Sequence, residues 1–190
     1  MPTKCPRLEE AFLSSPVVDF DGYPYFVNPL SDGIPRVDRD LLVEVADAMI
    51  GMADLDCDLI LAPEAMGIPL AVLITERTGI PFAVIRKREY GLPGEIALSQ
   101  VTGYSGSPMY INGVSPGDRV AIVDDVVSTG GTLRAVVGSL KSAGAVVTEV
   151  LTVFSKCRDR VGLSSELGVP VRSLVSVSSE GGRPRILRSD

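Results

Sequence analysis

Two adjacent acids followed by a run of hydroxyl-bearing residues and glycines are the part of the sequence best suited to chemistry. Asp124 and Asp125 directly follow four apolar residues, and residues 128–132 supply a serine, two threonines and two glycines. Glycines let a backbone turn tightly and bring its amides close to an anion, and the hydroxyls add donors. The acids would repel that anion unless they bind another part of the same ligand, such as sugar hydroxyls or a magnesium ion. The pattern therefore predicts a phosphate site with a second polar function beside it.

The flanking sequence predicts the elements that position this loop. Residues 120–123 are all apolar, as in a strand buried on both faces of a parallel sheet. Helical periodicity follows from 133 to 143, so the loop lies between the carboxyl end of a strand and the start of a helix, where negative charge is favoured. The loop lacks the lysine of nucleoside-triphosphate loops and the G-x-G-x-x-G spacing of dinucleotide sites. The alternative is an ordinary strand–turn–helix without a ligand.

Strand and helix patterns alternate along the rest of the chain. Strand patterns fall at 58–62, 81–85, 109–111, 146–154, 171–177 and, at a sheet edge, 183–188. Helical patterns fall at 8–13, 38–52, 68–78 and 158–167. The alternation predicts an α/β fold with a doubly wound, mostly parallel sheet. At 190 residues, a single domain over 1–190 is expected.

Two segments fall outside this alternation. Residues 17–28 contain short apolar pieces interrupted by Gly22 and Pro24, which predicts a small hairpin or strand packed outside the main sheet. Residues 89–108 contain four glycines and two prolines and show no periodicity. A structureless stretch of roughly twenty residues within a compact domain is usually functional, so a flexible lid is expected at about 88–108.

Composition excludes several classes of function. The net charge of −6 argues against a nucleic-acid surface, and no apolar run approaches the length of a membrane span. Without a signal peptide at the start, a cytoplasmic protein is expected. The chain has no histidine, which excludes Ser-His-Asp catalysis, Cys-His catalysis and histidine-bound metals. Its three cysteines are expected to be free thiols without a catalytic role.

Three other predicted strand ends carry residues suited to a ligand. Residues 64–67 form a strand-to-helix loop, 86–88 are three consecutive cations, and Lys156 follows the strand at 146–154. Three neighbouring cations cannot all be buried unpaired, and they favour a clamp for an anion. An ammonium donates and cannot accept, so Lys156 suits a carbonyl oxygen. The alternatives are a plain turn, a solvated basic segment and a surface lysine.

The stretch from 120 to 132 resembles the 5-phosphoribosyl-1-pyrophosphate (PRPP) loop of the type I phosphoribosyltransferases. Thirteen consecutive positions fit it, in the strand–loop–helix context of that family. The resemblance implies that Asp124 and Asp125 hold the ribose 2′- and 3′-hydroxyls and are the catalytic pair. The residues implied to bind the 5′-phosphate are Val127, Ser128, Thr129, Gly130, Gly131 and Thr132.

The same resemblance implies roles for the other strand ends. In the family the first of these loops contacts pyrophosphate through backbone amides, often with an unusual cis peptide, which assigns Ala65, Met66 and Gly67 to pyrophosphate. Relatives tend to carry Arg or Lys at the place of Met66. Arg86 and Lys87 are implied to clamp the same group.

A base site is implied on the other side of the phosphate loop. In 6-oxopurine members of the family, a lysine at the place of Lys156 donates to the purine O6. The resemblance also implies a small N-terminal hood at about 14–35 that would cover the base, with Phe26 as a packing or stacking surface. The implied base-binding residues are therefore Phe26, Asn28 and Lys156.

Shorter segments narrow the resemblance to the archaeal hypoxanthine/guanine phosphoribosyltransferase-like group. They fall at 25–29, 31–35, 64–69, 86–90, 92–96 and 102–105, within a match from about 16 to 156. The chain is also similar to adenine phosphoribosyltransferases around 86–94 and in the lid, and to the bacterial xanthine enzyme at 26–28 and at Lys156.

Two positions depart from the family pattern. Ser128 stands where many hypoxanthine-guanine enzymes carry Asp, and Gly103 stands where adenine enzymes often carry Glu. The acceptor of the purine proton therefore stays open among Asp125, Glu95 and water.

The implied reaction joins a purine to C1 of PRPP and releases pyrophosphate, giving a purine mononucleotide. A 6-oxopurine is the first choice of base, with IMP or GMP as product. Mg²⁺ is expected to arrive with PRPP, without direct protein ligation, and a homodimer is expected, with neither nucleic acid nor membrane as partner. The alternatives are an adenine phosphoribosyltransferase and a non-catalytic sensor of PRPP or nucleotide on the same fold.

Overall fold

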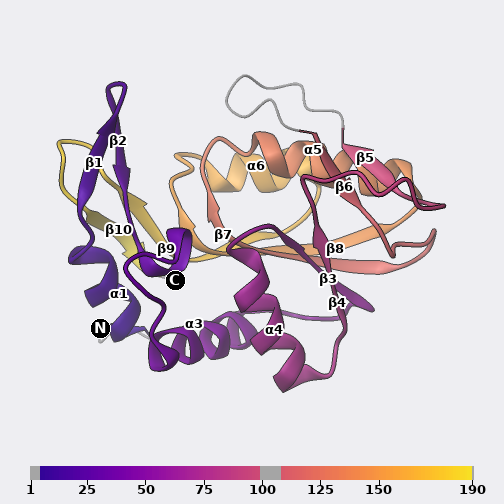
Figure 1. Ribbon diagram of the computed structural model, residues 1–190, viewed down its shortest axis with the longest axis horizontal. Helices are drawn as coiled ribbons and strands as arrows, with labels where there is room; N and C mark the ends of the chain where they lie inside the picture. The colour runs from indigo at the N-terminus through magenta and orange to yellow at the C-terminus, as the bar shows by residue number, and fades with distance from the viewer. Residues whose placement is uncertain (1–4, 99–107, 190) are drawn as a thin grey trace.

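Six strands form the central sheet of the protein, which a computed structural model describes at residues 5–98 and 108–189. Their order is β10-β9-β8-β7-β3-β4, and neighbouring strands are parallel except for the antiparallel pair β9 and β10 (Figure 1). The strands are β3 (Leu59–Pro63), β4 (Phe82–Ile85), β7 (Arg119–Val127), β8 (Val146–Ser155), β9 (Val171–Ser178) and β10 (Arg185–Ser189). The predicted doubly wound, mostly parallel sheet is confirmed.

The central strand β7 is buried on both faces. Residues 120–123 are completely inaccessible to solvent. Ile122 packs into the hydrophobic cluster on one face and Val123 into the cluster on the other, because successive strand residues point to opposite faces. Four apolar residues in a row are therefore what a strand covered on both sides requires.

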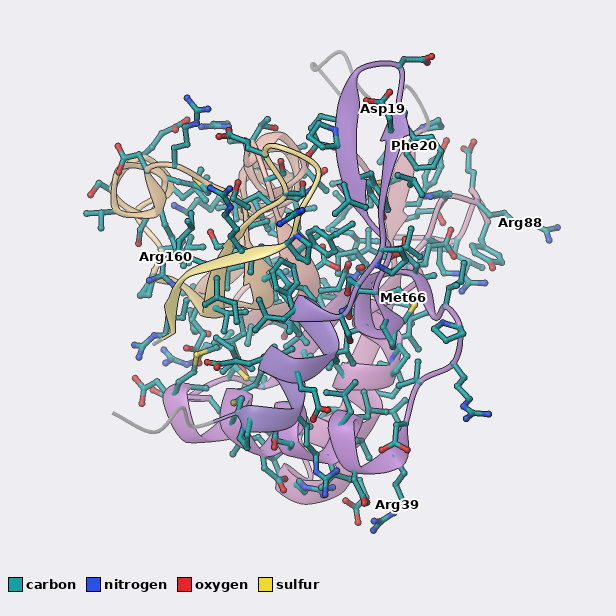
Figure 2. All side chains as sticks on the ribbon, turned by 90° about the vertical axis from the view of Figure 1, so that its left-hand side faces the viewer. Asp19, Phe20, Arg39, Met66, Arg88 and Arg160 are labelled. Carbon is teal, nitrogen blue, oxygen red and sulfur yellow. The ribbon has the colours of Figure 1, made fainter. Side chains whose placement is uncertain are left out.

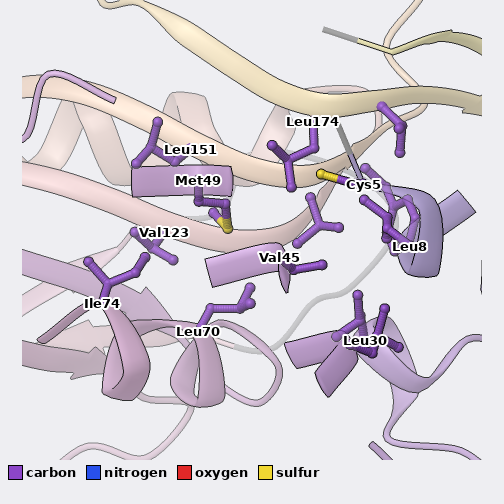
Figure 3. Packing of buried hydrophobic residues seen from close by; sticks show 14 of the residues in the cluster. Cys5, Leu8, Leu30, Val45, Met49, Leu70, Ile74, Val123, Leu151 and Leu174 are labelled. Carbon is purple, nitrogen blue, oxygen red and sulfur yellow. The ribbon is translucent and has the colours of Figure 1, made fainter. Parts of the chain in front are cut away.

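Helices cover the two faces of the sheet (Figure 1). In Figure 3, Met49 of α3 lies near Leu151 of β8, and Val45 of the same helix belongs to the same cluster. The helix begins after Asp38, whose carboxylate accepts hydrogen bonds from two backbone N–H groups of the first turn. In the ranges described, no helix is both long and apolar enough to span a membrane. Helices α1 (Pro6–Leu13), α3 (Arg39–Met52) and α4 (Gly67–Thr78) pack in one cluster, and α5 (Gly131–Ser142) and α6 (Arg160–Leu167) in the other.

The hood, residues 14–35, lies beside one end of the sheet (Figure 1). It contains the antiparallel hairpin of β1 (Val17–Phe20) and β2 (Tyr23–Phe26), followed by α2 (Pro29–Asp32). Figure 2 shows Phe20 near the tip of this hairpin, far from the core. At the other end of the hairpin, the Phe26 ring lies 5.0 Å from that of Phe12 and 5.4 Å from that of Phe154. These ring contacts join the hood to the core.

Three elements differ from the expectation. Strand β7 continues through Asp124 and Asp125, because its pairing with β8 extends to Val127. Helix α2 forms in the hood, where no helical pattern was predicted. Within the predicted lid, β5 (Ile96–Leu98) pairs with β6 (Met109–Ile111), so that part is not structureless, because Leu98 is buried against the second cluster. Residues 99–107 of the lid, including Gly103, lie outside the described residues.

Candidate active site

The strand order reverses between β3 and β7. From β3 the chain continues to β4 on one side of the sheet, and from β7 it continues to β8 and β9 on the other. In an open α/β sheet, ligands bind outside the carboxyl ends of the strands at such a switch point. The loop at 64–67 follows β3 and the loop at 128–130 follows β7. Topology therefore brings the predicted pyrophosphate loop and the predicted phosphate loop side by side.

The loop after β7 encloses a cavity of about 220 Å³. Gly130 caps α5 with a left-handed backbone (φ 80°), a conformation that favours glycine. The free N–H groups of the first turn of α5 lie at the same loop. All six residues predicted to bind the 5′-phosphate line this cavity, together with Asp124, Val126 and Leu133.

Asp124 and Asp125 are half-buried acids without a cation partner among the described residues. Burial raises the pKa of Asp124 well above its ordinary value, and the neighbouring charge of Asp125 raises it further. Burial also raises the pKa of Asp125 to about 6, with a contribution from the charge of Asp32. An ionised pair in this place is stabilised by hydroxyl donors or by a cation that a ligand brings. The pair therefore suits the ribose hydroxyls of a phosphorylated sugar.

The loop after β3 has the cis peptide that the resemblance implied, between Glu64 and Ala65. Gly67 begins α4 and packs directly on the central strand. A Cβ atom added at Gly67 would lie 2.7 Å from the carbonyl oxygen of Val123. Only glycine lets the start of α4 approach β7 this closely. The close approach places Gly67 next to the strand that carries the acids.

Glu64 connects the two segments predicted to bind pyrophosphate. Its Oε1 accepts a hydrogen bond from the backbone N–H of Lys87 at 2.7 Å, and its Oε2 lies 3.1 Å from the Arg86 guanidinium. The Lys87 side chain is exposed. Met66, labelled in Figure 2, lies beside the hood, since a Cβ added at Gly33 would meet its sulfur at 4.0 Å. Sequence reasoning considered Glu64 only as the cap of a plain strand–helix turn. An acid at the end of one strand and a basic run at the end of another were the available signal.

Lys156 lies at the end of β8, on the opposite side of the phosphate loop. Its backbone N–H donates to the Val127 carbonyl at 2.8 Å, which fixes it next to β7. Its side chain borders a second cavity, of about 280 Å³. That cavity is lined by Tyr23, Pro24, Ser128, Lys156, Val177, Ser178, Ser179 and Glu180. Ser128 lines both cavities, so the two meet at this residue.

Phe26 and Asn28 lie outside the lining of this second cavity. Phe26 is 2% exposed and packs in the aromatic cluster, and Asn28 is completely buried. The Asn28 side chain accepts a hydrogen bond from the N–H of Leu30 and donates to Ser15, so it caps α2 and ties the hood to the chain before it. Direct contact of Phe26 and Asn28 with a base stays a prediction.

The structure adds two hood residues that sequence reasoning did not single out. The Tyr25 hydroxyl donates to Asp32 at 2.6 Å, and burial together with this bond raises the Tyr25 pKa. Tyr23 reaches the Lys156 ammonium. The concentration of aromatic residues at 23–26 was the available signal.

The Glu95 carboxylate is hydrogen bonded to neighbouring parts of the chain. Its carboxylate accepts hydrogen bonds from Asn112 at 2.6 Å and from the backbone N–H of Gly91 at 3.0 Å. The hydrogen bond from Asn112 and the backbone hydrogen bonds from Gly91 and Tyr90 lower the pKa of Glu95. The choice among Asp125, Glu95 and water as proton acceptor stays open. Within the described residues, no group of three or more Cys, Asp or Glu side chains could hold a metal ion.

Comparison with known proteins identifies the family. The sequence profile of the family described as "Phosphoribosyl transferase domain" matches residues 41–181, most of the chain. The chain belongs to the phosphoribosyltransferase family. The family predicted from the 120–132 stretch is therefore confirmed.

Comparison with curated relatives indicates which group within the family the chain resembles. The chain is 48% identical over 177 residues to the hypoxanthine/guanine phosphoribosyltransferase of Methanosarcina acetivorans, which covers 93% of each protein. It is 52% identical over 150 residues to HGPRTase-like protein 2 of Haloferax volcanii, covering 79% of this chain and 83% of that protein. Among solved structures, adenine phosphoribosyltransferase from Thermoanaerobacter pseudethanolicus matches with a TM-score of 0.68 and 26% identity, over 89% of this chain and 99% of the other. These matches agree with the predicted archaeal hypoxanthine/guanine group.

Proposed function

We propose that this phosphoribosyltransferase transfers the phosphoribosyl group of PRPP to a 6-oxopurine, hypoxanthine or guanine, and forms IMP or GMP with release of pyrophosphate. The observation that carries the proposal is the junction of the two cavities at Ser128, with Asp124 in the first cavity and Lys156 in the second. The hypoxanthine/guanine names of relatives such as that from Methanosarcina acetivorans support it.

The phosphate loop and the acid pair would hold the sugar. The backbone N–H groups and hydroxyls of residues 128–132 surround a cavity suited to the 5′-phosphate. Asp124 and Asp125, as carboxylates, accept hydrogen bonds from the 2′- and 3′-hydroxyls. The ribose would then lie between the phosphate loop and the loop at 64–67, with C1 directed toward the second cavity.

The leaving group would lie at residues 65–67, with Arg86 and Lys87 beside it. Displacement at C1 passes through an oxocarbenium-like state, so catalysis depends on holding the two reactants in line and on stabilising the departing charge. No covalent nucleophile is required. Magnesium bound to PRPP would supply further neutralisation of the pyrophosphate. The acid pair fits a cation that arrives with the ligand, because these carboxylates have no cation partner among the described residues.

Lys156 selects the base by hydrogen-bond chemistry. Its ammonium carries only donors, so it is complementary to the O6 carbonyl of hypoxanthine or guanine and not to the amino group of adenine. This is the feature that favours the 6-oxopurine enzyme over the adenine enzyme. The predicted homodimer stays a prediction.

The test is pyrophosphate release from PRPP with magnesium and each of hypoxanthine, guanine, xanthine and adenine. We expect turnover with hypoxanthine or guanine to exceed that with adenine, and Lys156→Ala to lose this preference while still binding PRPP. Turnover with adenine alone would establish the adenine enzyme. PRPP binding without turnover of any base would establish a sensor and overturn the proposal.

A further inference from the structure

The Lys156 ammonium is held by residues of the hood. Its Nζ donates to the Tyr23 hydroxyl at 2.9 Å, across 133 positions of the chain. The same Nζ lies 4.9 Å from the ring centroid of Tyr23, 5.4 Å from that of Tyr25 and 4.6 Å from that of Phe26. Three aromatic rings and one hydroxyl therefore surround a single cation.

These contacts restrict where the ammonium can be. A lysine side chain has four rotatable bonds, and an unrestrained ammonium at the mouth of a cavity would sample many positions. The ring faces attract the cation and replace part of its hydration. The hydrogen bond to the Tyr23 hydroxyl also orients the Lys156 ammonium, because it uses one of the three N–H donors and leaves two for other acceptors.

The backbone next to Tyr23, which is itself 44% exposed, is held by a contact with the main sheet side of the cavity. The next residue, Pro24, accepts a hydrogen bond through its carbonyl oxygen from the Ser179 hydroxyl at 2.5 Å. Tyr23, Pro24 and Ser179 all line the second cavity with Lys156. The hood strand is thus joined to the far wall of the cavity next to the tyrosine.

We propose that Tyr23 is a specificity-determining residue of this site, which holds the Lys156 ammonium in the position that accepts a 6-oxopurine and rejects a 6-aminopurine. The inference rests on the proposed function and extends it to a residue of the hood. A fixed donor discriminates between a carbonyl and an amino group, whereas a mobile one can move away from the wrong base.

The test compares Tyr23→Phe with the wild-type protein. The substitution keeps the ring and removes only the hydroxyl. We expect the ratio of kcat/KM for hypoxanthine to that for adenine to fall roughly tenfold, the scale of one hydrogen bond to a charged group, while KM for PRPP is unchanged. A merely structural role would lower turnover with both bases equally and leave the ratio unchanged.

Tyr110→Phe is the matched control, because it also removes an exposed hydroxyl that is hydrogen bonded, in this case to Glu89. The ratio of kcat/KM for hypoxanthine to that for adenine should be the same in Tyr110→Phe as in the wild-type protein. If the wild-type protein prefers hypoxanthine to adenine and Tyr23→Phe shows the same ratio of kcat/KM values, this inference alone is overturned. A wild-type protein that does not discriminate between the two bases would overturn the proposed function and this inference together.

Discussion

The Nη1 atom of Arg134 donates a hydrogen bond to the carbonyl oxygen of Thr129 at 2.8 Å, which links the second turn of α5 back to the phosphate loop. The Nε and Nη2 atoms of Arg134 bind the two carboxylate oxygens of Glu166 in α6, at 2.7 and 2.8 Å. A trans peptide points its carbonyl and its N–H in opposite directions. Holding the Thr129 carbonyl on the Arg134 side therefore directs the Gly130 N–H away from the guanidinium.

Arg134→Lys should weaken PRPP binding without removing the positive charge. Lysine cannot make the planar fork to Glu166 and the bond to Thr129 at the same time. We expect KM for PRPP to rise roughly three- to tenfold, the effect of one hydrogen bond lost from a positioned loop, with kcat for bound substrate changed less.

The control for this variant is Arg77→Lys. Arg77 is likewise an ion-paired arginine on a helix, bound to Asp47 and Glu76, but it lies on the exposed side of α4. Its substitution should leave KM for PRPP unchanged. Equal effects of the two substitutions would show that Arg134 acts only through general stability.

Asp125→Asn should stabilise the ligand-free fold while it removes PRPP binding. The raised pKa of Asp125, about 6, means that the folded protein binds a proton more tightly than the unfolded chain does. The stability that this group contributes is therefore complete below the ordinary pKa of 3.8 and is lost as the pH rises through about 6. At pH 8 the variant avoids this loss, and Tm should rise by about 2–4 °C for each kcal/mol recovered.

Thermal unfolding at pH 8 and at pH 4.5 tests whether the contribution of Asp125 to stability falls as the pH rises. The gain in Tm of Asp125→Asn over the wild type should shrink at the lower pH, whereas Asp21→Asn, at the exposed hairpin turn, should show no such change. PRPP binding by calorimetry should fall by roughly tenfold or more, or at least about 1.4 kcal/mol. A variant that loses stability at pH 8 would make the carboxylate a structural group.

Gly67→Ala should destabilise the protein and weaken pyrophosphate binding together. The new Cβ would lie 2.7 Å from a backbone oxygen of β7, so the start of α4 must move. We expect a loss of about 1–3 kcal/mol, as for other overpacked sites. Chemical denaturation and pyrophosphate titration measure the two effects.

Gly138→Ala is the matched control, since Gly138 lies within α5 and a Cβ there meets nothing within 4 Å. Alanine should stabilise that helix by about 0.5–1 kcal/mol. Tight pyrophosphate binding by Gly67→Ala would remove this loop from the leaving-group site.

Arg86→Gln should weaken pyrophosphate binding more than Arg88→Gln does. Arg86 is oriented by Glu64 at the loop with the cis peptide, whereas the Arg88 guanidinium lies 5.7 Å from the ring centroid of exposed Tyr90. We expect roughly a tenfold loss for Arg86→Gln, about 1.4 kcal/mol, and a weaker salt dependence of binding. Calorimetry with magnesium pyrophosphate at two salt concentrations measures both, and equal effects of the two variants would contradict the assignment.

The phosphate loop, the alternation of strands and helices and the start of α3 could be predicted from the sequence. The strand–loop–helix at 120–132 was found because a phosphate loop is built from consecutive residues, whose types carry its geometry. The α/β fold followed from periodicity for the same reason, and Asp38 marked the start of α3. The length of β7 was not readable, because nothing local in Asp124 and Asp125 shows that β8 continues to pair with them.

Contacts across long separations were decided by packing. The Tyr23 hydroxyl and the Lys156 ammonium meet because the hood packs on the end of β8, and no periodicity in either segment encodes that meeting. Burial acts in the same way, because it raises the pKa of Asp125. Local sequence specifies which groups are present, whereas their mutual distances and their access to water arise only when distant segments pack together.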